Sequence, residues 1–156
     1  MRTPKEFVME HPFFTGMRPQ YLDILAASAT EVKFAAGQII FREDEPASQF
    51  YLIGKGRVCL EAHEVADGTV PIQTVGPGEV LGWSWLFPPF AWHVQARAIE
   101  PVEAVVLDGA HLLVTAEKDK TFGYELMKRV CQVVIHRLQA TRKRLAAQQV
   151  ETALDG

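Results

Sequence analysis

The chain has 156 residues and a formal net charge of −3, and this length suits one domain with a full hydrophobic core. Its apolar content is ordinary for a globular protein, and no apolar run approaches the roughly 18 residues that span a bilayer. The first residues, through Thr3-Pro4-Lys5-Glu6, contain no apolar signal core. These features exclude a transmembrane segment and predict one cytoplasmic domain over residues 1–156, without membrane association.

The start of the chain, residues 1–29, is predicted to form short helices. Thr3 can cap a first helix that has proline at its first position and Glu6 three residues after the cap, which is the pattern of a capping box. This helix is expected over residues 3–10. A second helix is expected over residues 19–28, where apolar residues recur at helical spacing.

Residues 30–108 are predicted to be a β region. Short runs rich in β-branched and aromatic residues follow one another there, and glycine, proline and polar turns separate them. Asp67-Gly68 carries the signal of a tight hairpin. Many short strands separated by turns are typical of a β-sandwich or barrel. The predicted strands cover residues 31–34, 38–41, 50–53, 57–63, 70–75, 95–99 and 102–107.

Residues 109–149 are predicted to be helical. Asp108 can cap a short helix over residues 110–117, and a longer helix is expected over residues 121–148. Lysine and arginine are concentrated between residues 120 and 145, and Glu125 is the only acidic residue of this stretch. A basic helix beside an acidic remainder is typical either of a nucleic-acid surface or of a solvated face lying against that remainder, and we adopt the second interpretation.

The longer helix carries an apolar stripe at spacings of three and four residues. We expect this stripe to pair two copies of the chain, so the predicted partner is a second copy in a homodimer formed through the C-terminal helix. The alternative is a helix that folds back on the β region of its own chain. Tyr124 and Ile135 lie off the stripe and are expected to pack on the β region. The stripe consists of Met127, Val130, Cys131, Val134, Leu138, Thr141 and Leu145.

Residue types that serve catalysis and metal binding are not arranged for either role. The five histidines include no His-x-His pair. Ser84 lies in Gly-Trp-Ser-Trp-Leu and lacks the glycine that a nucleophile elbow needs two residues later. Cys59 and Cys131 form no Cys-x-x-Cys pair and are expected to be buried, reduced thiols. The sequence therefore predicts a non-catalytic protein with no metal site and no cofactor.

The stretch over residues 34–60, with glycines at 37 and 56, and the later run Pro77-Gly78-Glu79-Val80-Leu81-Gly82 together carry a family resemblance. They resemble the cyclic-nucleotide-binding domain family, the sensor part of catabolite-activator-type regulators, over roughly residues 10–147. The resemblance implies a mainly β fold: an eight-stranded jelly roll with short N-terminal helices and a long C-terminal helix. Asp44 stands near one turn glycine of the family, and aspartate tolerates such turns.

The resemblance also implies a ligand site. Backbone N–H groups at Gly78 would face a cyclic phosphate, and the Glu79 carboxylate would accept a hydrogen bond from the ribose 2′-hydroxyl. The implied ligand is a cyclic nucleotide or another small molecule. The candidate ligand-binding residues are Gly78, Glu79, Val80, Leu81, Trp92, His93 and Val94.

The chain departs from the family where the phosphate-binding arginine is expected. That position falls on Trp92, or on Ala91 after a one-residue slip, and the hydroxyl residue that follows it falls on His93. We therefore expect a cleft without a fixed positive charge, and cyclic-nucleotide affinity weakened roughly tenfold to several hundredfold. Five aromatic residues crowd residues 83–92, and they either line a pocket for a planar ligand or fill the cavity.

The function predicted from the sequence is a non-catalytic, small-molecule-sensing regulatory domain with weak or altered nucleotide binding. A helix-turn-helix needs about 25 residues, and few residues follow Gln149, so no DNA-binding domain and no specific DNA binding are expected. Two alternatives stay open. The chain is a protein-interaction module with a filled, ligand-free pocket, or it is the sensor part of a transcription regulator.

Overall fold

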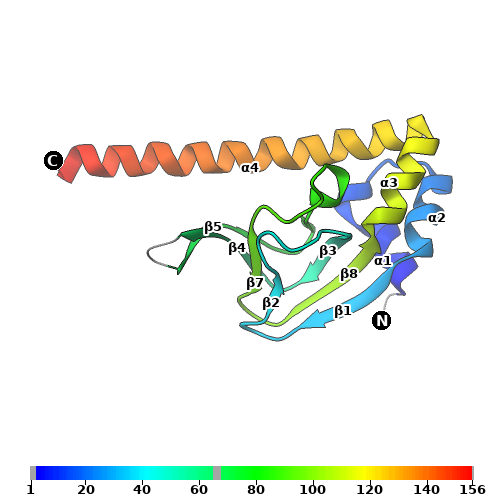
Figure 1. Cartoon of the computed structure of the whole chain (residues 1–156), viewed down its shortest axis with the longest axis horizontal. Helices are drawn as coiled ribbons and strands as arrows, with labels where there is room; N and C mark the ends of the chain where they lie inside the picture. The colour runs from blue at the N-terminus through cyan, green and yellow to red at the C-terminus, as the bar shows by residue number, and fades with distance from the viewer. Residues whose placement is uncertain (1–2, 65–67, 156) are drawn as a thin grey trace.

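The computed structural model describes residues 3–64 and 68–155 of the protein. Eight strands form two antiparallel sheets, short helices pack at one end of them, and one long helix runs along the domain (Figure 1). The prediction of an eight-stranded jelly roll with flanking helices is confirmed. Residues 65–67, which include Asp67 of the predicted Asp67-Gly68 hairpin, lie outside the described residues, and Gly68 has a φ of 78°.

The first sheet has the strand order β1-β8-β3-β6, and the second has the order β2-β7-β4-β5. The first sheet is apolar on both faces: Phe50 and Leu52 of β3 belong to the cluster under the helices, and Tyr51 and Ile53 belong to the cluster between the two sheets. In the pairing of β3 with β8, Phe50 lies opposite Leu107 and Leu52 opposite Val105. The strands are β1 Thr30–Phe34, β2 Ile39–Phe41, β3 Gln49–Lys55, β4 Val58–Glu64, β5 Gly68–Val75, β6 Val80–Leu81, β7 Gln95–Ala98 and β8 Val102–Asp108.

The helices begin where the sequence places their caps. The capping box is formed, because Thr3 Oγ1 accepts from the Glu6 backbone N–H at 3.1 Å and the Glu6 carboxylate accepts from the Thr3 N–H. Asp108 Oδ1 accepts from the backbone N–H of His111 in the same way. The helices are α1 Pro4–Glu10, η1 Pro12–Phe14, α2 Pro19–Ala27, η2 Ser84–Leu86, α3 Gly109–Lys118 and α4 Lys120–Asp155.

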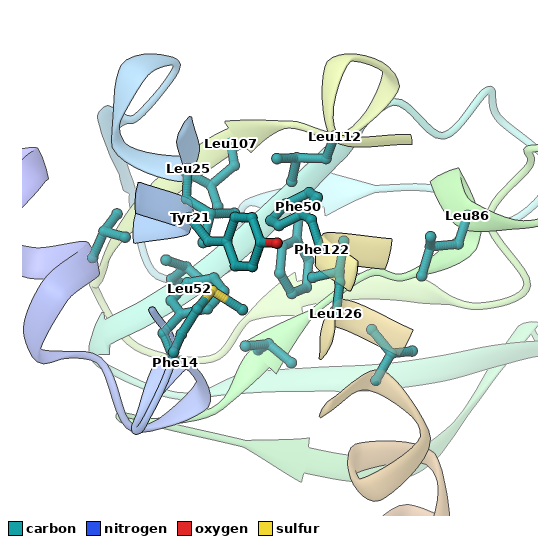
Figure 2. Close-up of a cluster of buried hydrophobic side chains, with 14 of the residues drawn as sticks. Phe14, Tyr21, Leu25, Phe50, Leu52, Leu86, Leu107, Leu112, Phe122 and Leu126 are labelled. Atoms are coloured by element: carbon teal, nitrogen blue, oxygen red, sulfur yellow. The ribbon is translucent and has the colours of Figure 1, made fainter. Parts of the chain in front are cut away.

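The largest hydrophobic cluster joins the helices to the first sheet. Figure 2 shows Tyr21 of α2, Phe50 of β3 and Phe122 of α4 meeting at its centre. The first turns of α4 bury Phe122, Leu126 and Val130, which lie on one side of the helix. A second cluster fills the space between the two sheets and includes Phe41, Tyr51, Leu60, Leu81 and Trp92. The fold therefore holds the root of α4 firmly against the jelly roll.

The exposed apolar side of α4 differs from the predicted stripe. Val130 is only 2% exposed and belongs to the core, whereas Tyr124 and Ile135, predicted to pack on the β region, are 64% and 53% exposed. The predicted stripe mixed two neighbouring sides of the helix, because each residue turns the helix by about 100°. Cys131 is exposed and Cys59 is half-buried, so the prediction of two buried thiols was wrong. We name the observed exposed side the α4 apolar face: Tyr124, Met127, Cys131, Val134, Ile135, Leu138 and Leu145.

The basic residues of α4 do not share a side of the helix. Arg129 pairs with Glu125 at 2.9 Å and donates to the Thr15 carbonyl, and Lys128 lies over the Tyr124 ring. Arg137 points inward and is largely buried. A basic stripe for nucleic acid is therefore not formed along the described part of this helix. The described helices include none that is both long and apolar enough to cross a membrane.

A buried carboxylate tethers three strands of the second sheet. Glu61 of β4 is 7% exposed, and its carboxylate accepts from Arg97 Nε of β7 at 2.9 Å and from Thr69 Oγ1 of β5 at 2.8 Å. Gln95 donates to it as well. Burial acts to raise the pKa of Glu61, but these hydrogen bonds outweigh it and hold the pKa below its usual value. Arg97 is thus the ion-pair partner of Glu61 within the second sheet.

Candidate functional site

A pocket of about 470 Å³ lies between the second sheet and α4. Its volume falls within the range of small-molecule sites, and most of its wall is apolar or aromatic. We name it the α4 pocket. Its walls come from β2, β4 and β5, from the segment over residues 81–94, and from α4: Phe41, Leu60, Ile72, Gln73, Leu81, Gly82, Trp83, Ser84, Trp92, His93, Val94, Val134, Arg137, Leu138 and Thr141.

Trp92, one of the two positions at which the family's arginine was expected, forms a wall of this pocket. Its ring stacks on Phe41 with a centroid distance of 3.9 Å and an interplanar angle of 13°, and only 4% of Trp92 is exposed. Gly82 makes room for the ring, since a Cβ at that residue would collide with the indole. Backbone hydrogen bonds join Trp92 to Asp44 and Glu45, and Asp44 adopts the left-handed turn conformation expected near the missing glycine.

The aromatic segment both packs the core and lines the pocket. Trp85 is 1% exposed, belongs to the main cluster and donates through Nε1 to the Gly82 carbonyl at 2.8 Å. Trp83 and Trp92 contribute walls to the α4 pocket. Phe87 and Phe90 are exposed at the tip of the segment. The rings therefore leave an open pocket, although the sequence left filling and lining as equal alternatives.

Arg137 brings a guanidinium into the cleft from α4. It donates to the Val80 carbonyl oxygen, and its charged carbon lies 4.5 Å from the centroid of the Trp83 ring. Burial lowers the pKa of Arg137 to about 10, partly offset by the nearby Glu79, so the side chain is a cation at neutral pH. The expectation of a cleft without a fixed positive charge was therefore wrong. Ala91 and Trp92 of the loop carry no charge, and Arg137 of α4 supplies the cation instead.

The sequence contained a usable signal for Arg137. The buried positions 122, 126, 130 and 133 define the inward side of α4, and position 137 continues this side at helical spacing. A charged residue on the buried side of a helix is unusual and marks a candidate functional group. The sequence analysis had placed the helix in a different rotation and so missed it.

Glu79 does not face the α4 pocket. Its side chain is exposed, and its carboxylate accepts from the backbone N–H of Gly76 at 2.7 Å. The N–H of Gly78 donates to the Ile53 carbonyl and the N–H of Glu79 to the Gly76 carbonyl, so these two groups are engaged in the turn. Glu79 thus caps its own turn.

The predicted site residues divide between two hollows. Leu81, Trp92, His93 and Val94 line the α4 pocket. Gly78, Glu79 and Val80 line a second, more polar pocket of about 310 Å³, which also includes Arg129, Gln132 and His136 from α4. Arg137 borders both pockets and separates them.

Polar groups at the rim of the α4 pocket bind one another. The ring Nδ1 of His93, which is exposed, lies 3.1 Å from Ser84 Oγ. Gln73 Nε2 and Thr141 Oγ1 both donate to the Arg137 carbonyl, at 2.9 and 3.0 Å. The bond from Gln73 fastens the middle of α4 to β5, whereas the bond from Thr141 lies within the helix. Over the part of the chain that is described, no three histidine, cysteine, aspartate or glutamate side chains converge as a metal site would require.

A jelly roll with an apolar pocket, closed on one side by the helix that follows the sheets, is a ligand-binding regulatory architecture. Residues 31–119 match the family model described as the cyclic nucleotide-binding domain, and the chain belongs to this family. The family assignment made from the glycine-spaced stretch and the Gly78-Glu79 run is confirmed.

Three relatives illustrate the range of the family. This chain is 41% identical to the acetyltransferase Pat of Mycolicibacterium smegmatis over 90 residues, which are 58% of this chain and 27% of the relative. This chain is also 28% identical to a CRP-like cAMP-activated global transcriptional regulator of Mycobacterium tuberculosis over 142 residues. This match covers 90% of this chain and 61% of the relative. The chain thus spans only part of each curated relative. The solved structure of a candidate cyclic nucleotide-binding protein of Geobacter metallireducens GS-15 superposes with a TM-score of 0.77 at 31% identity, covering 88% of this chain and 99% of that one.

Proposed function

We propose that the chain is a non-catalytic, cytoplasmic regulatory domain that senses a small molecule in the α4 pocket and transmits its binding through α4. The observation that carries this proposal is the composition of the pocket wall. Val134, Arg137, Leu138 and Thr141 of α4 all line the pocket, so a bound ligand contacts the helix directly. A ligand that fits one position of α4 better than another shifts the balance between the two positions.

The proposal includes altered cyclic-nucleotide binding. Trp92 occupies the position expected for the phosphate-binding arginine, and the Glu79 carboxylate is engaged by Gly76 outside the pocket wall. A charge-assisted hydrogen bond contributes about 1.5–3 kcal/mol, so its loss from the loop weakens binding about tenfold to a hundredfold or more. Cyclic AMP and cyclic GMP are therefore weak ligands of this domain in the proposal, and another small molecule is the natural one.

The proposed partner is a second copy of the chain. The α4 apolar face lies beside the pocket wall, and Val134 and Leu138 belong to both. A long helix that exposes seven apolar or sulfur-containing residues along one side is satisfied most simply by a symmetric helix pair. Pairing of two α4 helices would place a subunit interface directly against the ligand.

A second candidate function is the sensor part of a transcription regulator. The 142-residue match to the CRP-like regulator of Mycobacterium tuberculosis favours it, because it covers 90% of this chain. The match to acetyltransferase Pat supports the broader idea that such a sensor serves different output domains. Both candidates share the same pocket and differ only in what α4 controls.

Isothermal titration calorimetry with cyclic AMP, cyclic GMP and a panel of planar small molecules tests the proposal. We expect weak binding of the cyclic nucleotides and tighter binding of at least one planar compound. Glu79→Ala should leave cyclic-nucleotide affinity within about twofold, because the carboxylate caps a turn. Nanomolar cyclic-nucleotide binding that Glu79→Ala abolishes would overturn the altered-ligand proposal, and the absence of heat from every compound would favour the protein-interaction alternative.

A further inference from the structure

The guanidinium of Arg137 has one donor without an acceptor. Among the described side chains, its Nε is the one buried nitrogen or oxygen that lacks a hydrogen-bond partner. A terminal nitrogen of the same group donates to the Val80 carbonyl. Arginine carries five donors in a rigid planar fork, and a buried donor left unsatisfied is unfavourable. The fork is thus poised to bind an acceptor that the protein itself does not supply.

The surroundings of Arg137 define what this acceptor belongs to. Of the residues described in the α4 pocket wall, Arg137 is the only lysine, arginine, aspartate or glutamate. The remainder of the wall is mainly aliphatic and aromatic, and it includes the stacked rings of Phe41 and Trp92. One cation in an apolar pocket matches a ligand with one anionic group and an apolar body.

We propose that the α4 pocket takes a flat, mainly apolar molecule with a single anionic group, and that this group binds the guanidinium of Arg137. The inference rests on the proposed sensing function and specifies the class of ligand. A carboxylate accepts two parallel hydrogen bonds from an arginine fork, and Nε is one of the two donors of such a pair. A planar ring system lies favourably against the aromatic stack.

The second pocket is a poorer place for the anion. Glu79 lies in its wall, and the carboxylate of Glu79 repels a second negative charge there. Arg129 borders the same pocket, but its guanidinium is already paired with Glu125 and with the Thr15 carbonyl. Arg137 borders both pockets, and only the α4 pocket combines it with a mainly apolar wall that carries no carboxylate among its described residues.

Matched probes of one shape and different charge test the inference. Titration calorimetry is run at neutral pH with 2-naphthoate, an aromatic carboxylate, and with 2-naphthamide, its neutral analogue. The wild-type protein should bind the carboxylate about ten- to a hundredfold more tightly than the amide. Arg137→Gln should abolish this preference and change the affinity for the amide by less than about threefold. Arg142→Gln is the matched control, because it removes a charge from an exposed position of the same helix and should leave the preference intact.

The outcomes separate this inference from the function on which it rests. Equal binding of both probes to the wild-type protein, or a preference that survives in Arg137→Gln, overturns the anion inference and leaves the pocket as a small-molecule site. No binding of either probe, together with no binding from the wider ligand panel, overturns both. Circular dichroism establishes that each variant is folded, and if Arg137→Gln is not, the wild-type ratio of the two affinities and an Arg137→Lys variant decide the question.

Discussion

Arg137 is predicted to be held in the pocket at the expense of stability. Its pKa falls to about 10 on folding, well below the usual value for arginine, which corresponds to about 3 kcal/mol against the charged form. The folded pKa lies below the unfolded one, so stability rises with pH above about 10 and the full penalty is present at neutral pH. Arg137→Met removes this penalty and places a thioether against the Trp83 ring.

The substitution also removes favourable interactions. The lost hydrogen bond to Val80 and the lost contact with Trp83 together offset about 2 kcal/mol of the gain. We therefore expect Arg137→Met to stabilise the domain by about 1 kcal/mol, or to raise its Tm by about 2–4 °C. Urea unfolding followed by tryptophan fluorescence measures the first quantity, and calorimetry the second.

Arg129→Met is the comparison, because that arginine stands on the same helix but has its guanidinium paired with Glu125 and Thr15. It should destabilise the domain by about 1–2 kcal/mol. Opposite signs for the two variants support the reasoning. A loss of more than about 2 kcal/mol in Arg137→Met would refute it, since Arg137 would then be a structural anchor.

Three further predictions concern the pocket wall, the helix and the second sheet. Trp92→Ala should lower the free energy of unfolding by about 3–5 kcal/mol in urea, because it empties a buried ring site, whereas the exposed Phe87→Ala should change it by less than about 0.5 kcal/mol. Ile135→Glu should shift a dimer to monomers in sedimentation velocity without lowering the stability of the monomer, and an unchanged sedimentation coefficient would argue against pairing through the α4 apolar face. The folded pKa of Glu61 is lowered, so the stabilisation by its carboxylate is present above about pH 4.5 and disappears as the pH falls through the folded pKa. Glu61→Gln should therefore flatten the acid side of a curve of unfolding free energy against pH. Identical acid sides for wild type and variant would contradict the role assigned to the Glu61–Arg97 pair.

The fold was predictable because its signals are local. The capping box at Thr3, the cap at Asp108 and the runs of alternating apolar residues each specify an element within a few residues. The short strand β6 could not be recognised from its pattern, because two residues are too few to show alternation.

The site was only half predictable because its parts come from distant segments. The segment over residues 81–94 was identified from the family resemblance, and four of the seven predicted residues line the α4 pocket. Arg137 was missed because its direction depends on the rotation of α4 about its own axis, which is fixed by the packing of Phe122 and Leu126. The engagement of Glu79 by Gly76 likewise depends on the geometry of the turn over residues 76–79.

The length of α4 gives the domain a mechanical property. Its first turns are embedded in the core, and residues 142–150 are exposed as the helix runs past the sheets (Figure 1). From Arg137 to Asp155 the helix extends about 27 Å, so a tilt of about 10° at the pocket displaces the far end by about 5 Å. The exposed part of α4 therefore acts as a lever that pivots about the buried first turns of the helix. A movement too small to disturb the jelly roll becomes, at the tip, a displacement as large as one helical turn.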